Sequence, residues 1–79
     1  MYYVYIIESK IRQDRYYIGF TRNLEDRLAH HNSGAVPSTA SFKPWAYRTC
    51  IAFNDKERAL AFEHYLKTHS GRAFLAKRL

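Results

Sequence analysis

The stretch from Tyr16 to His31 constrains the fold most, because a strand pattern there leads directly into a helix pattern. Residues 16–20 are mostly aromatic or β-branched, which favours a strand. Asn23 is a favourable N-cap, and two acidic residues follow it where helical N–H groups are unpaired. The sequence therefore predicts a strand, a tight junction and then a helix that begins at Leu24.

One face of this predicted helix mixes apolar and ionisable side chains. At about 100° per residue, four residues fall within a sector of roughly 100°. They are Leu24, Arg27, Leu28 and His31. Such a face should point inward, yet half of it is Arg and His. We interpret it as one wall of a functional site rather than as ordinary core.

Two strands are predicted before this helix. Residues 2–8 are apolar or aromatic almost throughout, which is typical of a central strand. The polar run 9–15 indicates a hairpin connection, so the strand at 16–20 is expected to pair antiparallel with the first. Tyr17 and Gly19 share one face of that second strand. Because Gly19 has no side chain, we expect a ligand or another backbone to approach closely there.

A loop and a third strand are predicted after the first helix. Residues 32–34 (NSG) form a helix-stop sequence in which Gly34 is free to adopt positive φ. Residues 33–45 are mostly small and polar and contain both prolines, which indicates a surface loop. Residues 47–53 then favour a third strand.

A second helix is predicted at residues 55–68, with Asn54 as its N-cap. Glu63 lies on the apolar face of this helix. Burying an ionised carboxylate without a partner costs several kcal/mol, so Glu63 needs a cation, a proton or a route to solvent. Residues 70–71 (SG) are expected to break the chain before a short terminal helix at 72–79.

Length, charge and cysteine content limit the class of protein. Seventy-nine residues fit one domain, 1–79, and a net charge of +6 favours polyanions such as nucleic acid. A generic basic surface tuned for solubility has the same charge. The single cysteine, Cys50, excludes an internal disulfide. No apolar run approaches the roughly 20 residues of a membrane span, and no signal-peptide pattern begins the chain, so we expect a cytoplasmic location without a membrane.

Four polar residues are predicted to meet on apolar faces. They are Tyr17, Arg27, His31 and Glu63. Each has an ordinary structural interpretation: a core tyrosine with an exposed hydroxyl, an Arg27–Glu63 salt bridge, or a histidine at a helix C-terminus. Together they also have the chemistry that cutting a phosphodiester requires. Glu63 suits one Mg²⁺ or Mn²⁺, Arg27 suits a phosphate, and Tyr17 suits a general base.

The order of these residues resembles the GIY-YIG endonuclease family. Tyr3-Val4-Tyr5 and Tyr17-Ile18-Gly19 occupy the places of its two tripeptides, with Arg27 and His31 in the first helix and Glu63 in the second. The sequences at 31–34 (HNSG) and 43–45 (KPW) are similar to those of stand-alone bacterial proteins with this domain. Tyr3 stands where the first tripeptide has glycine, a change that we expect the strand to tolerate.

The resemblance implies an α+β fold with a three-stranded antiparallel sheet flanked by two to three helices. It also implies that the protein hydrolyses DNA with a single divalent metal. Tyr17 would be the general base, Tyr5 would orient water and phosphate, and Arg27 would stabilise the transition state. Glu63 would bind the metal, and His31 matches a histidine of some branches. We also expect four nucleic-acid contacts. They are Arg22, Lys43, Trp45 and Lys67.

Three functions remain open from the sequence. The first is a metal-dependent endonuclease, structure-selective rather than sequence-specific, with a role in DNA repair or recombination. Its partner would be DNA, with RNA not excluded, and a second protein could supply specificity. The second is a non-catalytic nucleic-acid-binding module that keeps the geometry of the site. The third is a protein-interaction domain in which the inward polar residues form only a structural network.

Overall fold

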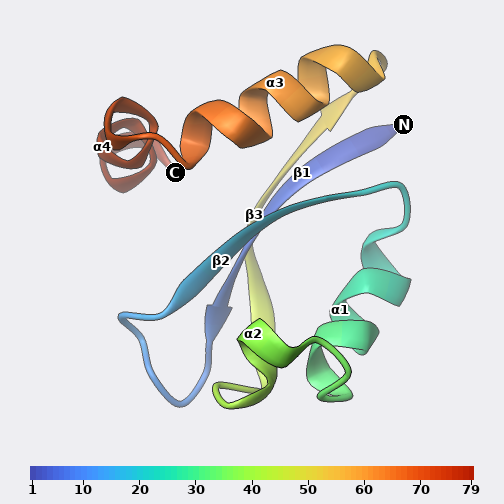
Figure 1. Cartoon of the computed structure of the whole chain (residues 1–79), viewed down its shortest axis with the longest axis vertical. Coiled ribbons are helices and arrows are strands. Elements are labelled where there is room, and N and C mark those ends of the chain that lie inside the picture. The colour runs from blue at the N-terminus through green and yellow to red at the C-terminus, as the bar shows by residue number, and fades with distance from the viewer.

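The computed structural model describes all of residues 1–79 and contains one three-stranded sheet (Figure 1). The strands are β1 (Tyr2–Ser9), β2 (Tyr16–Thr21) and β3 (Trp45–Phe53). Their order is β2-β1-β3, and β1 pairs antiparallel with both neighbours. The predicted central position of the first strand is confirmed. β2 is therefore an outer strand, with one edge that no other strand covers.

Helices cover both faces of the sheet (Figure 1). The helices α1 (Leu24–Asn32) and α2 (Pro37–Ala40) lie on one side, and α3 (Lys56–Leu66) and α4 (His69–Arg78) lie on the other. The predicted α+β fold is confirmed, with α2 as an additional short helix. None of the four helices has the length and apolar character that crossing a bilayer requires.

The alternation of side chains along β1 divides the core into two clusters. One cluster packs β1 and β2 against α3 and α4, and its buried members are Val4, Ile6, Ile18, Ala59, Leu66 and Leu75. The other lies on the α1 and α2 side, with Tyr5, Ile7 and Trp45 buried. Tyr17, Leu24 and Leu28 pack against this second cluster. The helix face that carries Arg and His therefore points toward the sheet, as the sequence predicts.

The boundaries of α1 also follow the sequence prediction. The Asn23 side chain accepts a hydrogen bond from the backbone N–H of Asp26, which satisfies one of the unpaired groups at the start of the helix. After the helix, Gly34 has a φ of +85°, a conformation that favours glycine. Local side-chain chemistry is sufficient to set both ends of this helix.

The segment predicted as a surface loop, residues 33–45, is more ordered than expected. Pro37 occupies the first turn of α2, where its missing N–H costs nothing. Thr39 is buried in this helix, and Trp45 is a buried first residue of β3. The Asn32 side chain accepts from the Trp45 N–H and donates to the Trp45 carbonyl, which ties the segment to the end of α1. The loop prediction is wrong because this packing is long-range.

Two predictions at the second half of the chain are also wrong. Asp55, not Asn54, caps α3, accepting from the backbone N–H of Glu57. Gly71 does not break the chain but lies inside α4, which Thr68 caps. A Cβ at Gly71 would overlap the carbonyl of Tyr65, so glycine is required there for the close packing of α4 on the end of α3.

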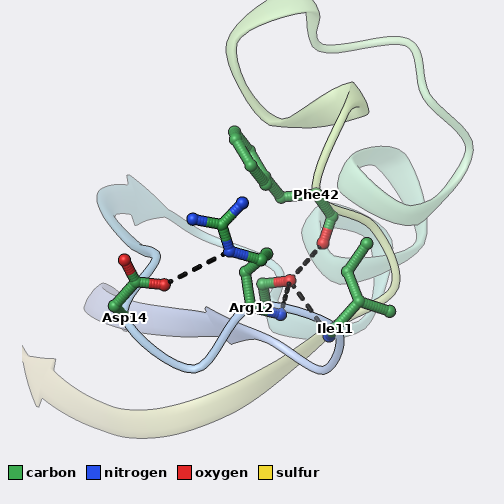
Figure 2. Close-up of polar contacts among 5 residues, drawn as sticks. Ile11, Arg12, Asp14 and Phe42 are labelled. Carbon is green, nitrogen blue, oxygen red and sulfur yellow. Dashed lines mark hydrogen bonds and ion pairs between the residues drawn. The ribbon is translucent and has the colours of Figure 1, made fainter.

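The connection between β1 and β2 is held by a buried serine. The Ser9 hydroxyl accepts from the backbone N–H groups of Ile11 and Arg12 and donates to the carbonyl of Phe42 (Figure 2). The ion pair between Arg12 and Asp14 spans 3.6 Å in the same turn (Figure 2). The hairpin is thereby attached to the segment that follows α2.

Candidate active site

The candidate site is built around Tyr5, which crosses beneath β2 at Gly19. The two residues face each other in the β1–β2 register, and the Tyr5 side chain is only 1 % exposed. A Cβ at Gly19 would lie closer than 3.0 Å to three atoms at the end of the Tyr5 ring, including Oη. The close neighbour expected at Gly19 is therefore this phenol, neither a ligand nor another backbone.

The Tyr5 hydroxyl begins a chain of buried hydrogen bonds. Its Oη lies 2.8 Å from His31 Nε2, and His31 Nδ1 lies 2.9 Å from Thr39 Oγ1. The Thr39 hydroxyl in turn donates to the carbonyl of Val36 at 3.3 Å. His31 and Thr39 are each 1 % exposed, so these side chains have no access to bulk water. Three elements, β1, α1 and α2, thus meet through one imidazole.

The direction of this chain follows from the single proton of each hydroxyl. Because the Thr39 hydroxyl donates its hydrogen to the Val36 carbonyl, its oxygen accepts a hydrogen bond from His31 Nδ1–H. The other ring nitrogen, Nε2, then carries a lone pair and accepts from the Tyr5 hydroxyl. His31 is a neutral acceptor in this arrangement, and the remaining lone pairs of Tyr5 Oη stay free for a further donor.

The electrostatics of the site favour the neutral form of both groups. Burial raises the pKa of Tyr5 far above its ordinary value; Arg27 opposes this shift, while Tyr17 and Glu63 add to it. Burial lowers the pKa of His31, with a further contribution from Arg27. Tyr5 is therefore a protonated phenol at neutral pH, suited to orienting a molecule rather than to removing a proton.

Arg27 and Tyr17 approach this chain from two sides. Arg27 is half-buried and lines a polar pocket of about 320 Å³ with Thr21, Asn23, Asp26 and His30. Its guanidinium makes no ion pair with Glu63. The ring of Tyr17 is half-buried and meets the ring of His31 edge-on, with centroids 5.0 Å apart. The guanidinium thus remains available to a phosphate.

The partly buried carboxylate of Glu63 is paired with Lys67, the residue that directly follows α3. Its Oε2 accepts a hydrogen bond of 2.7 Å from Lys67 Nζ, one turn later in the chain. The Glu63 side chain is 19 % exposed, and its other oxygen has no partner in the protein. The structural alternative of a sealed Arg27–Glu63 pair is therefore wrong, and one carboxylate oxygen of Glu63 is free to bind a cation.

Of the four residues predicted to contact nucleic acid, one is buried in the core and three lie closer to the surface. Trp45 is 4 % exposed, and its indole N–H donates to the carbonyl of Thr39, so its predicted contact with nucleic acid does not fit. Trp45 is a core residue. The Arg22 guanidinium lies 5.2 Å from the ring centroid of Tyr2, and Lys43 is exposed. Lys67 remains beside Glu63, as described above.

Thr39 and Tyr47 are site residues that the sequence interpretation missed. The Tyr47 hydroxyl donates to the carbonyl of Leu24 at the start of α1, and its ring meets that of Tyr5 edge-on. Burial raises the pKa of Tyr47 to about 12. Thr39 had no local signal, since a threonine in a polar segment is ordinary. The alternation of Tyr47 along its strand was the one available signal.

Comparison with known proteins identifies the family of this arrangement. The family model described as the GIY-YIG catalytic domain matches residues 1–77. A UPF0213 protein of Staphylococcus haemolyticus is 34 % identical over 70 residues, covering 87 % of this chain and 83 % of that protein. A UPF0213 protein of Halobacterium salinarum is 32 % identical over 68 residues, covering 85 % and 86 %.

A second kind of relative is much longer. A "Structure-specific endonuclease subunit SLX1" of Debaryomyces hansenii is 38 % identical over 74 residues, covering 84 % of this chain and 21 % of that protein. The corresponding protein of Podospora anserina is 39 % identical over 69 residues, with 80 % and 20 % covered. The chain thus spans about a fifth of the length of these subunits.

Proposed function

The chain belongs to the GIY-YIG family of catalytic domains, and we propose that it is an endonuclease that hydrolyses DNA phosphodiester bonds. The observation that carries this proposal is the buried chain from Tyr5 through His31 to Thr39. It holds a protonated phenol at a position whose electrostatics also depend on Arg27, Tyr17 and Glu63. A buried network in which every polar atom has a partner fixes the phenol in one orientation beside these groups.

Each residue then has one role in the proposed reaction. Tyr17, acting as a phenolate, takes a proton from the attacking water. The buried Tyr5 phenol, held by His31, fixes the wall of the site beside Tyr17 and Arg27. Arg27 offers its planar fork to the phosphate oxygens as negative charge develops on them. His31 touches no substrate and positions Tyr5. A bond from water oxygen to phosphorus forms, the bond from phosphorus to the leaving oxygen breaks, and the leaving oxygen takes up a proton from solvent.

A single divalent metal, Mg²⁺ or Mn²⁺, fits the residues present. No group of three or more His, Cys, Asp or Glu side chains could hold a metal by itself, so Glu63 would share the metal with ligands from outside the protein. Mg²⁺ is commonly bound by one or two carboxylates together with waters and substrate phosphate. Glu63 would hold the metal through the oxygen that Lys67 leaves free. Such a metal supplies positive charge to the leaving oxygen.

The natural substrate is proposed to be DNA with a particular structure, such as a nick, flap or branch, in repair or recombination. Contacts from Lys and Arg to phosphates give affinity that falls with salt and carries little sequence information. The relatives named as subunits of a structure-specific endonuclease support this substrate class and suggest a protein partner. Without turnover, the same surface would bind nucleic acid only.

A cleavage assay tests the proposal. Nicked, flapped, single-stranded and supercoiled DNA are each incubated with the protein and Mg²⁺ or Mn²⁺. We expect cleavage of at least one substrate, and a loss of 100-fold or more in Tyr17→Phe, Arg27→Ala and Glu63→Ala, since each removes charge stabilisation or proton transfer. Circular dichroism confirms that each variant is folded.

Glu57→Ala is the matched control, because Glu57 is an exposed carboxylate on the same helix as Glu63. It should cleave within about twofold of the wild-type rate. If the wild type cuts no substrate faster than Glu63→Ala does, the nuclease proposal is refuted. Binding that falls with salt would then favour the non-catalytic module.

A further inference from the structure

A second surface adjoins the candidate site along the free edge of β2. A pocket of about 350 Å³ lies there, lined by residues of the hairpin, β2, the end of α3 and α4. These residues are Asp14, Arg15, Tyr16, Tyr17, Ile18, Lys67 and Arg72. Tyr17 and Lys67 belong to both surfaces, because both line the pocket and the Lys67 Nζ also contacts Glu63. A nucleic-acid strand that crosses the edge of β2 to reach Glu63 would therefore pass the pocket.

The pocket carries an excess of positive charge. Arg15, Lys67 and Arg72 are cations, and Asp14 is the one acid. The charge of Asp14 is matched outside the pocket by Arg12, at 3.6 Å (Figure 2). The guanidinium of Arg15 lies over the ring of Phe42, 4.8 Å from its centroid. A local field of this sign favours a phosphate.

Arg72 is an exposed cation in the first half of α4. Its guanidinium makes no ion pair and no hydrogen bond within the protein. Gly71 allows α4 to pack directly against the end of α3, which keeps Arg72 close to Lys67. An unpaired cation in this position suits an external anion.

Tyr16 adds an aromatic surface beside these cations. Tyr16 is 38 % exposed and is the first residue of the outer strand β2. By alternation it shares a face with Ile18, which packs toward α3 and α4, where Lys67 and Arg72 lie. Cations beside an exposed aromatic ring are the combination with which proteins bind single-stranded nucleic acid, the cations on phosphates and the ring on a base.

We infer that this pocket binds a single-stranded segment of the nucleic acid next to the bond that is cut, with Arg72 on a phosphate and Tyr16 stacked on a base. The inference rests on the proposed function and narrows its substrate class to DNA with an unpaired arm. A base in a continuous duplex is already stacked on its neighbours, so it cannot lie on Tyr16 as well.

Equilibrium binding tests the inference without cleavage. A fluorescent single-stranded oligothymidylate and a blunt duplex of equal length are titrated with the full chain in EDTA, over a range of salt. We expect Tyr16→Ala to weaken binding of the single strand fivefold or more, and binding of the duplex less than twofold. Arg72→Ala should weaken binding and lower the slope of log K against log salt by about 0.7.

Two variants elsewhere on the surface are matched controls. Tyr65 is 40 % exposed and lies outside the pocket, and Arg58 is an exposed cation paired with Asp55 at 3.7 Å. Tyr65→Ala and Arg58→Ala should bind the single strand within twofold of wild type. Thermal unfolding of every variant confirms that the fold is kept.

Three results would overturn the inference. They are no binding of the single strand by the wild type, pocket variants that bind like the two controls, and an equal loss of duplex binding in Tyr16→Ala. The proposed function fails separately, in the cleavage assay above. If Tyr16 and Arg72 are needed for binding but no DNA is cut, the inference stands and the nuclease proposal fails. If DNA is cut but the Tyr16 and Arg72 variants bind the single strand like wild type, the nuclease proposal stands and the inference fails.

Discussion

Replacing the Thr39 hydroxyl tests the buried chain that holds Tyr5. Thr39→Val keeps the shape of the side chain and removes the oxygen that accepts from His31 Nδ1–H. Two tautomers of the His31 imidazole are then possible. With the proton on Nδ1, the Nδ1–H has no acceptor; with the proton on Nε2, the Tyr5 hydroxyl loses its acceptor. Either way, one buried donor is unsatisfied.

The magnitude follows from burial. An unsatisfied buried donor costs about 1–3 kcal/mol, and His31, Thr39 and Tyr5 are too buried for water to replace the lost partner. Thr39→Ser keeps the hydroxyl and loses one methyl group, which costs about 1 kcal/mol. If Thr39 served packing alone, the order would reverse, because valine has the same shape and is more apolar. We therefore expect Thr39→Val to be less stable than Thr39→Ser.

Chemical denaturation of the three proteins at pH 7.5 measures these free energies of unfolding. For a domain of this size, 1 kcal/mol corresponds to a change in Tm of about 4–8 °C. The ¹⁵N resonances of the His31 ring provide a second readout: the wild type and Thr39→Ser should show the neutral tautomer with the proton on Nδ1. A Thr39→Val variant as stable as wild type, with Thr39→Ser less stable, would refute the direction assigned to this chain.

Three further perturbations have defined outcomes. Burial lowers the pKa of His31, so the folded state resists protonation of this imidazole. The free energy of unfolding should therefore fall as pH drops from about 6.5 toward the lowered pKa, by at most about 1.4 kcal/mol per pH unit. A difference in this free energy between wild type and His31→Gln that stays constant from pH 7.5 to 5 would contradict the prediction. Gly19→Ala should cost about 1–3 kcal/mol in denaturation and abolish cleavage, because its methyl displaces the ring of Tyr5. Gly71→Ala should destabilise the protein as well, through overlap with the carbonyl of Tyr65, although helix propensity alone predicts a gain of about 1 kcal/mol; a measured gain would show that α4 can move.

Features that depend on near neighbours in the chain were predictable from the sequence. The alternation on β1, the cap of α1 at Asn23, the positive φ of Gly34 and the inward face with His31 are all confirmed. Each reflects the geometry of one strand, turn or helix, in which the side-chain direction repeats with a fixed period. The two tripeptides, followed by Arg27, His31 and Glu63, resemble the GIY-YIG family, and that resemblance implied the three-stranded sheet; both are confirmed.

Contacts between distant segments were decided by the tertiary structure alone. Thr39 became the partner of His31, and Trp45 became core, because residues 33–45 pack back onto the end of α1. Glu63 pairs with Lys67, whereas a pair with Arg27 was equally compatible with the sequence. A threonine hydroxyl, an indole or a carboxylate accepts several partners of similar energy. Which partner it meets is set by how whole elements pack, and no local period records that packing.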